Sequence, residues 1–513
     1  MKDKPDSKAE FNRRDLLKGA AAAGLATVLS PMVGDRTPGA PAKKDLVRAE
    51  NDKQGTSDWL LEKTRVDPKT RYHCPWIEGY CSHTSIKAGD ALSIMVSTNP
   101  ASSFVIDLYR LGYYGGKGGR HLQKLGPFKG KPQPDPAVGD ERLRECQWEP
   151  AVKLDIPMDW PSGVYLGKLT AENEGLQSYI VFIVRDDRPC DFLFQSSDTT
   201  WAAYNRWPSQ YSLYDDGKKE WYWGPGVRVS WDRPYGKYCQ IFDAPLSQGS
   251  GEFLLWEFPL AFWMEKEGYD VSYISNVDTH ADAKGLLRTK GLISVGHDEY
   301  WSIDMFNHVK AAIAAGVNVA FLSGNTCCGV IDFKPNQAKV TNRNISRIGQ
   351  YGPIQEEAVK AGFPELKDLK HNGPNEAKLI GARSTFPVTG GADWICAKEK
   401  HWLFNGTKMK NGDAIPGLVG WEWHGDPADI PGLEVVAKGD VTSRAATHAY
   451  TATIYPGPRD NFVFNSATIW WSDGLSAPPG YLHPSAHGAS PKGPDSRVQR
   501  ITANLLNRFR GKI

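Results

Sequence analysis

The sequence has no excess of either charge and no long apolar run. Its 513 residues carry 61 Lys and Arg against 59 Asp and Glu, a net charge of +2. This balance gives no electrostatic reason to expect nucleic acid or an anionic membrane as a partner. The apolar run over 19–29, GAAAAGLATVL, is too short to span a bilayer, and no later stretch reaches the necessary length. We therefore expect no transmembrane span in the mature chain.

Zinc-binding cysteine motifs are also missing. The eight cysteines contain no CxxC pair, and Cys327 and Cys328 are adjacent. Structural zinc sites draw their ligands from closely spaced Cys and His pairs, so a zinc module is excluded. In an oxidising compartment the cysteines allow disulfides. A small loop closed by Cys74 and Cys81 is one option, and the pairing as a whole stays open.

The N-terminus has the features of an export signal. Arg13 and Arg14 precede the apolar run, and Ala40-Pro41-Ala42 is a small-residue cleavage site. Paired arginines before a modest apolar stretch resemble a twin-arginine signal, which predicts export to the periplasm or the extracellular space. That route carries folded proteins, often with a cofactor already loaded, which is a first indication of a metal.

Two kinds of hydrophobic pattern divide the rest of the chain. Up to residue 187, short alternating runs separated by turn residues predict a β-sandwich. The glycine-rich segment 109–120 has no helix after it, so a hairpin turn is favoured over a phosphate loop. Beyond residue 188, buried strands alternate with helices, which predicts a doubly wound parallel sheet. Residues 35–55 are rich in charge, Pro and Gly, which predicts disorder there. The expected domains are a signal (1–42), a linker (43–74), a β-sandwich (75–187), an α/β domain (188–480) and a C-terminal helix and tail (481–513).

Polar residues follow three of the predicted strands in the α/β part. CDFLFQSS leads into the segment of Tyr204, GLISVG into His297 and Glu299, and NVAFLSG into Asn325. Ligands of open α/β sheets bind beyond the carboxyl ends of the strands. If the three strands are neighbours, these side chains share one rim. His297 and Glu299, two positions apart, point the same way if their segment is extended.

Longer motifs at this rim carry a family resemblance. TWAAYNRW, SLYDDG, GHDEYWS and FLSGN occur in order, with LYRLGYYGGKGGR before them and GLVGWEW after them. The chain resembles the large subunit of N,N-dimethylformamidase and its wider family over most of residues 75–475. The resemblance implies a β-sandwich joined to a glutamine-amidotransferase-like α/β domain. It also implies hydrolysis of the C–N bond of a small amide.

The resemblance further implies a mononuclear ferric ion, Fe3+. Its ligands fall on Tyr204, Tyr214 and Glu299, with Tyr211 a rival for Tyr214 because the match there crosses a gap. His297 and Asn325 fall on positions around the metal, and Glu422 of GWEW on the residue that takes the proton of water. Phenolate and carboxylate oxygens are hard donors that suit a trivalent cation. The family's small subunit is not encoded in this chain, so the need for a partner stays open, as does a homo-oligomer.

Each assignment has a structural alternative. Buried tyrosines commonly pack with bonded hydroxyls, an Asn after a strand caps turns, and Tyr300 and Trp301 are expected in the core. The 18 Trp favour large cores. A second reading of the Trp content is a non-catalytic envelope protein whose aromatic groove binds carbohydrate or peptidoglycan. A third is an enzyme that uses His297 as a base with another metal or none.

Overall fold

The structure, a computed structural model, describes residues 45–236, 247–385, 390–442, 447–483 and 490–512. The predicted signal lies outside the described residues. Those described form a mixed α/β structure of many strands and few helices, in agreement with the expected α/β plus β class. In this part of the chain, no helix is long and apolar enough to cross a membrane.

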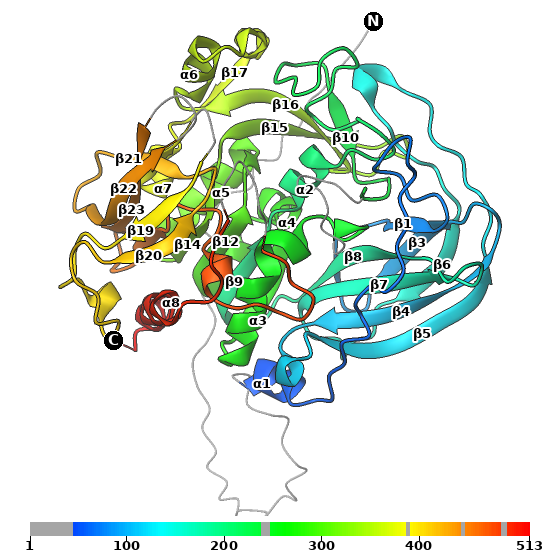
Figure 1. The fold of residues 1–513 in the computed structure, drawn as a ribbon, viewed down its shortest axis with the longest axis horizontal. Helices are drawn as coiled ribbons and strands as arrows, with labels where there is room; N and C mark the ends of the chain where they lie inside the picture. The colour runs from blue at the N-terminus through cyan, green and yellow to red at the C-terminus, as the bar shows by residue number, and fades with distance from the viewer. Residues whose placement is uncertain (1–44, 237–246, 386–389, 443–446, 484–489, 513) are drawn as a thin grey trace, which may run out of the picture. The chain divides into compact units, whose positions relative to one another are not determined.

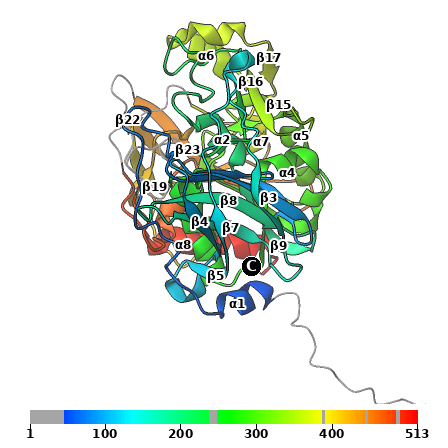
Figure 2. The ribbon, with the colours of Figure 1, turned by 90° about the vertical axis from the view of Figure 1, so that its right-hand side faces the viewer.

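The N-terminal strands form two antiparallel-rich sheets that share one apolar core (Figure 2). The three-stranded sheet has the order β1 (Glu78–Cys81), β3 (Ala91–Ser97), β6 (Pro150–Asp155). The five-stranded sheet has the order β2 (Ser85–Lys87), β8 (Gln177–Arg185), β7 (Gly163–Ala171), β4 (Ser103–Leu111), β5 (Gly119–Lys129). Ile94 of one sheet and Ile106 and Phe182 of the other belong to the same buried cluster. The predicted hairpin is confirmed, because β4 and β5 pair antiparallel across the glycine-rich turn.

A seven-stranded sheet forms the centre of the second half (Figure 1). Its order is β11 (Val271–Ser275), β9 (Cys190–Ser196), β12 (Thr289–His297), β14 (Asn318–Gly324), β24 (Phe462–Asn465), β23 (Thr447–Pro456), β22 (Glu434–Thr442). The first five strands run parallel and the last two antiparallel. Continuous burial of β9 and β14 matches their apolar sequences, because parallel strands are covered on both faces.

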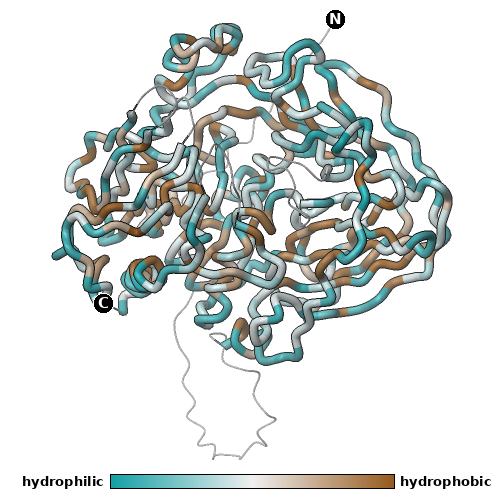
Figure 3. Tube along the Cα trace, viewed as in Figure 1, coloured by the Kyte–Doolittle hydropathy of each residue, from teal (hydrophilic) through white to brown (hydrophobic). Residues whose placement is uncertain are grey.

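Helices cover both faces of this sheet. Phe192 and Ile293 share a cluster with residues of α3 (Phe258–Lys266) and α8 (Ser496–Phe509). Leu193 and Leu292, each adjacent to one of these residues in its strand, join the cluster of α5 (Ile303–Ala314). Neighbouring residues of one strand therefore face opposite helical layers. Figure 3 shows apolar residues along these central strands and hydrophilic residues along the outer loops.

A smaller sheet begins where the central strands end. It has the order β10 (Arg228–Ser230), β16 (Asn344–Tyr351), β15 (Gly329–Lys334), β13 (Tyr300–Trp301), with β17 (His371–Gly373) beside β16. In Figure 1, β15 and β16 arch above the central sheet. The remaining strands pair as β18 (Ala382–Ser384) with β21 (His424–Pro427) and β19 (Ala392–Ile395) with β20 (Ala414–Val419). The remaining helices are α1 (Leu46–Asn51), α2 (Asp198–Tyr204), α4 (Asn276–Ala281), α6 (Ile354–Lys360) and α7 (Ala377–Ile380), with a π-helix, η5 (Phe253–Glu257).

The expected disorder over residues 35–55 is wrong for the part that the structure describes, because helix α1 forms there. Trp59, in the segment 43–74 expected as a linker, is fully buried. Residues 43–513 make one compact unit, and the domain boundary near 187 stays a prediction. The loop closure by Cys74 and Cys81, which the sequence left as one option, is not formed, since Cys81 is a buried free thiol. The C-terminal helix is present as α8, with Val498, Ile501 and Leu505 on its buried side.

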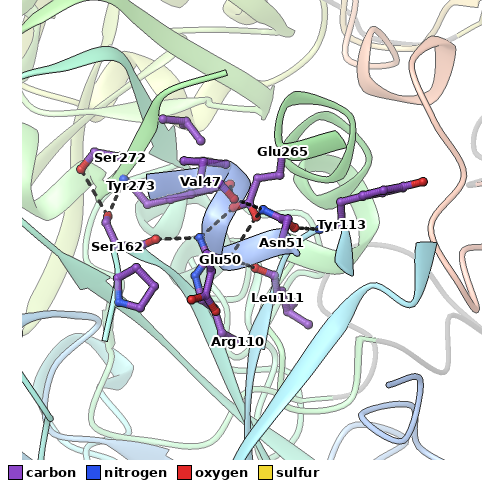
Figure 4. Close-up of polar contacts among 12 residues, drawn as sticks. Val47, Glu50, Asn51, Arg110, Leu111, Tyr113, Ser162, Glu265, Ser272 and Tyr273 are labelled. Atoms are coloured by element: carbon purple, nitrogen blue, oxygen red, sulfur yellow. Dashed lines mark hydrogen bonds and ion pairs between the residues drawn. The ribbon is translucent and has the colours of Figure 1, made fainter. Parts of the chain in front are cut away.

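A buried ion pair joins the N-terminal strands to the α/β part. Arg110 of β4 donates to Glu265 of α3 at 2.9 and 2.8 Å, and both side chains are at most 1% exposed (Figure 4). Asn51 of α1 donates to the same carboxylate at 2.7 Å. Arg110 also donates to the carbonyl of Ser162. One carboxylate thus receives donors from β4 and from the segment that was expected to be disordered.

We predict that Glu265→Gln lowers the free energy of unfolding by about 3–5 kcal/mol, because it leaves the Arg110 charge buried without its anion. The shift is measured as the urea midpoint of the exported chain. Glu149→Gln, which removes the carboxylate of an exposed pair with Lys131, is the control and should leave the midpoint unchanged. Equal midpoints for Glu265→Gln and wild type would show that the pair does not join the two parts.

Candidate functional site

The three strand ends singled out in the sequence are neighbours. Strand β12 pairs in parallel with β9 on one side and β14 on the other, and His297 lies opposite Gly324. Helix α2 follows β9 directly and ends at Tyr204. The carboxyl edge of the central sheet therefore carries the polar segments side by side, as ligand-binding edges of α/β sheets do.

Two phenols and a carboxylate meet at this edge. The Tyr204 hydroxyl donates to Oε2 of Glu299 at 2.7 Å, and the Tyr214 hydroxyl lies 2.6 Å from the Tyr204 oxygen. Tyr214 Oη is 3.2 Å from both oxygens of Glu299. None of the three side chains is more than 4% exposed. The structure thus brings together the three residues that the family resemblance singles out as ligands.

Backbone contacts fix the positions of these side chains. Thr200 of α2 accepts a hydrogen bond from the amide of Glu299 at 3.0 Å, which ties the helix of Tyr204 to the carboxylate segment. The amide of Leu213 donates to the carbonyl of Ala203 at 2.8 Å and holds the segment of Tyr214 beside the same helix. Hydrogen bonds from these main-chain amides therefore help to position the three side chains, in addition to the contacts between their oxygens.

His297 and Glu422 extend the cluster on one side. His297 Nε2 lies 3.2 Å from Oε2 of Glu299 and forms an ion pair with Oε2 of Glu422. Burial lowers the pKa of His297, but the carboxylates of Glu422 and Glu299 outweigh it and raise the pKa to about 10. Burial raises the pKa of Glu422 to about 7, against the effect of His297. A proton shared by this pair is therefore held next to the phenols.

Burial also affects the pKa values of the two phenols. Burial first, and the Glu299 carboxylate second, raises the pKa of Tyr204 and of Tyr214 well above the ordinary value. Both hydroxyls are protonated in this arrangement and donate to the oxygens around them. A cation at the cluster would have to displace these protons, as deprotonated oxygen ligands require.

Asn325 and Glu422 adopt strained backbone conformations. Their φ values are +48° and +63°, in the left-handed region that non-glycine residues seldom occupy. Gly324 precedes Asn325, and a Cβ there would lie 2.1 Å from the carbonyl oxygen of Glu422, so only glycine lets the two segments approach. The side-chain oxygen of Asn325 is buried and has no hydrogen-bond partner within the described residues. Strain and an unsatisfied polar atom are typical of functional positions.

Asp298, between the two rim residues, has a structural role. Its carboxylate accepts four hydrogen bonds, from Gln195, Asn276, Ser294 and Trp301, at 2.7 to 3.0 Å. These donors come from β9, α4, β12 and β13. The carboxylate therefore fixes the direction of the chain where it leaves the central sheet.

The structure distinguishes Tyr214 of SLYD from its rival Tyr211, which directly precedes that motif. The ring of Tyr211 contacts the guanidinium groups of Arg142 and Arg144, each 4.6 Å from its centroid, and takes no part in the cluster. Tyr214 does. The expectation that Trp301 is a core residue agrees with its full burial.

Tyr300, Arg347 and Glu252 were missed by the sequence analysis. The Tyr300 hydroxyl, expected only in the core, donates to the Tyr214 oxygen, and Arg347 donates to Tyr300 at 2.6 Å. Glu252 is fully buried at the start of the π-helix η5, where burial raises its pKa to about 8. Tyr300 is adjacent to the GHDE motif, which is a usable signal; the sequence around Arg347 and Glu252 carries none.

The donor set fits a hard cation. Three oxygens from separate segments lie within 2.6 to 3.2 Å of one another, the spacing of ligands that share a small ion. Within the described ranges, no group of three His, Cys, Asp or Glu side chains could hold a metal. A cation here would accordingly depend on phenol oxygens, which favour trivalent over soft divalent metals.

The tryptophans do not form an exposed groove. All 18 lie in the described part of the chain, and Trp221, at 42%, is the one counted as exposed there. Its ring contacts Tyr214, with centroids 5.5 Å apart. Sugar-binding surfaces present several accessible aromatic faces, so this distribution favours packing over the carbohydrate-binding alternative.

Comparisons with known proteins agree with these features. A family model described as N,N-dimethylformamidase beta subunit-like, C-terminal, matches residues 105–486 and includes every residue of the cluster. A model of the twin-arginine translocation pathway signal sequence matches residues 10–30, so the protein is exported by that route to the periplasm or beyond. No curated protein matches the chain.

We predict that Asp298→Asn destabilises the fold by about 1–3 kcal/mol, because the amide nitrogen then faces donors that had an acceptor. Thermal unfolding measures the loss. Asp304→Asn, at a 64% exposed position at the start of α5, is the matched control and should unfold like wild type. Unchanged stability of Asp298→Asn would mean that the four hydrogen bonds do not hold the rim.

Proposed function

The chain belongs to the N,N-dimethylformamidase beta subunit-like family, and from this membership and the site geometry we propose that it is an exported, metal-dependent amidohydrolase. Its substrate is a small amide, whose C–N bond it hydrolyses. The observation that carries the proposal is the buried cluster of Tyr204, Tyr214 and Glu299 at the carboxyl edge of the sheet. The fold proposed with it is a β-sandwich followed by a glutamine-amidotransferase-like α/β domain.

The proposed cofactor is one ferric ion held by the two phenolates and the carboxylate. When bound, such an ion lowers the pKa of a water molecule and polarises an amide carbonyl. Three protein ligands leave positions for water and substrate. The low exposure of the donors, 4% or less, keeps bulk water away and strengthens each electrostatic contact.

The remaining residues handle protons and orientation. Glu422 takes the proton of the attacking water as the new C–O bond forms, which suits a carboxylate with a pKa of about 7. His297, paired with Glu422, passes a proton to the departing nitrogen as the C–N bond breaks, and the products are a carboxylate and an amine. The Asn325 amide group donates an N–H to the carbonyl oxygen as it gains charge.

We predict that the purified protein contains equimolar iron and shows a visible tyrosinate-to-iron band. Glu299→Gln should lose most of its iron, since a neutral amide replaces an anionic ligand. Metal analysis and absorption spectra measure both. Glu257→Gln is the matched control: burial raises the pKa of Glu257 well above its ordinary value, so the amide replaces a neutral acid and iron is retained. A colourless, iron-free wild type that still hydrolyses amides would refute the proposal.

We predict separately that Glu422→Gln lowers kcat roughly a hundred- to ten-thousand-fold while iron content stays that of wild type, because the variant loses a general base and no metal ligand. Release of amine from a panel of small amides measures the rate. Glu357→Gln, an exposed partner of Arg383, serves as the control and should keep full activity. Wild-type rates in Glu422→Gln would assign the proton transfer to another group.

A further inference from the structure

Arg347 is a buried cation without a carboxylate partner. It lies on β16, is 2% exposed, and forms no ion pair with any described residue. Its Nη1 reaches the carbonyls of Leu213 and Tyr222 at 3.4 Å each, and its guanidinium lies 4.7 Å from the ring centroid of Tyr214. A buried charge is costly unless other groups compensate it. Around Arg347 those groups are phenol rings and oxygens.

Tyr300 connects this cation to the oxygen cluster. Arg347 Nη2 donates to the Tyr300 oxygen at 2.6 Å, and the Tyr300 hydroxyl donates in turn to the oxygen of Tyr214. A hydroxyl polarised by a cation is a stronger donor, so the second hydrogen bond gains from the first. Tyr300 is completely buried, and water does not compete for either bond.

The two proposed ligand phenols therefore differ in their surroundings. Tyr214 accepts from Tyr300 and lies beneath the guanidinium of Arg347. Tyr204 is next to the His297 ring, at 5.3 Å, and within the described residues its oxygen accepts a hydrogen bond from Tyr214 alone. That bond disappears when Tyr214 gives up its proton to become a ligand. Only Tyr214 then keeps an outside donor.

We propose that Tyr300 and Arg347 are positioning residues of the metal cluster, which make Tyr214 the weaker and Tyr204 the stronger electron donor to the bound cation. The inference rests on the proposed function, because it assigns unequal roles to the same two phenols. A hydrogen bond to a phenolate stabilises its lone pairs and reduces the electron density it gives to a metal. The fixed charge of Arg347 acts on Tyr214 in the same direction.

The test is the visible tyrosinate-to-iron band of the iron-loaded protein. Removing the hydroxyl of Tyr300 raises the energy of the Tyr214 lone pairs, so Tyr300→Phe should shift the band to longer wavelength with iron content unchanged. Resonance Raman spectra of the same samples should show two phenolate modes at different frequencies in wild type. In Tyr300→Phe the two frequencies should converge, because the two phenolates then have similar surroundings. A merely structural tyrosine would not produce either change.

Tyr351→Phe is the matched control. Tyr351 is also fully buried, and its hydroxyl donates to the carbonyls of Trp301 and Ser302, away from the cluster. It should lose stability without moving the band. Arg347→Lys is a second variant. It keeps the positive charge but loses the hydrogen bond from the guanidinium to the Tyr300 oxygen. It should also shift the band to longer wavelength, by a smaller amount than Tyr300→Phe.

The outcomes separate this inference from the proposed function. A wild-type protein without iron or colour would overturn both. A coloured wild type whose band and phenolate modes are unaltered in Tyr300→Phe and Arg347→Lys would overturn the inference and leave the amidohydrolase proposal intact. A band shift in Tyr351→Phe equal to that in Tyr300→Phe would likewise overturn it, because the effect would then be general to buried tyrosines.

Discussion

The site depends on a break between two stretches of parallel pairing. Strands β12 and β14 pair up to His297 and Gly324, and the same two chain segments pair again as β13 and β15 from Tyr300 and Gly329. Between the stretches, two residues on one segment face four on the other. In this gap the two segments do not pair with each other, but each is fixed before and after it by strand pairing. The four hydrogen bonds to Asp298 keep this gap in one conformation, so Glu299 is directed at the phenols instead of into a core.

Export by the twin-arginine route fits the chemistry of the interior. Cys81, Cys146, Cys190, Cys327, Cys328 and Cys396 are buried free thiols. A protein that folds in a reducing cytoplasm needs no disulfides, and thiols enclosed by folding are protected when the protein later meets an oxidant. A metal chosen in the cytoplasm would be enclosed in the same way. The free thiol at Cys81 is therefore consistent with folding before export.

The sequence predicted those features that depend on residues close to one another in the chain. The strand ends, the hairpin and the pair at His297 and Glu299 could be predicted because strand periodicity and short motifs report on neighbours in the chain. Arg347 could not, since its contact with Tyr300 joins residues 47 positions apart in strands that no motif connects. Helix α1 was missed for a similar reason: its charged sequence is typical of a linker, and its stabilising contact from Asn51 reaches Glu265, 214 residues away. The family resemblance singled out Tyr214 but left Tyr211 as a rival, and it is the structure that places Tyr214 in the cluster.

The charges around the cluster define the part that Arg347 plays beside the proposed ferric ion. With both phenols ionised, Tyr204, Tyr214 and Glu299 carry three negative charges in a space that excludes water. The charges of Glu422 and His297 cancel, and among the described residues Arg347 is then the further charge in contact with the phenols. A divalent ion would leave the ligand set anionic and dependent on Arg347 for neutrality. A trivalent ion neutralises the ligands by itself, so the guanidinium charge remains to polarise Tyr300 and distinguish one phenolate from the other. Among the described residues, Arg347 is the cation that contacts Tyr300, so the hydrogen bond between them is where this charge reaches the cluster.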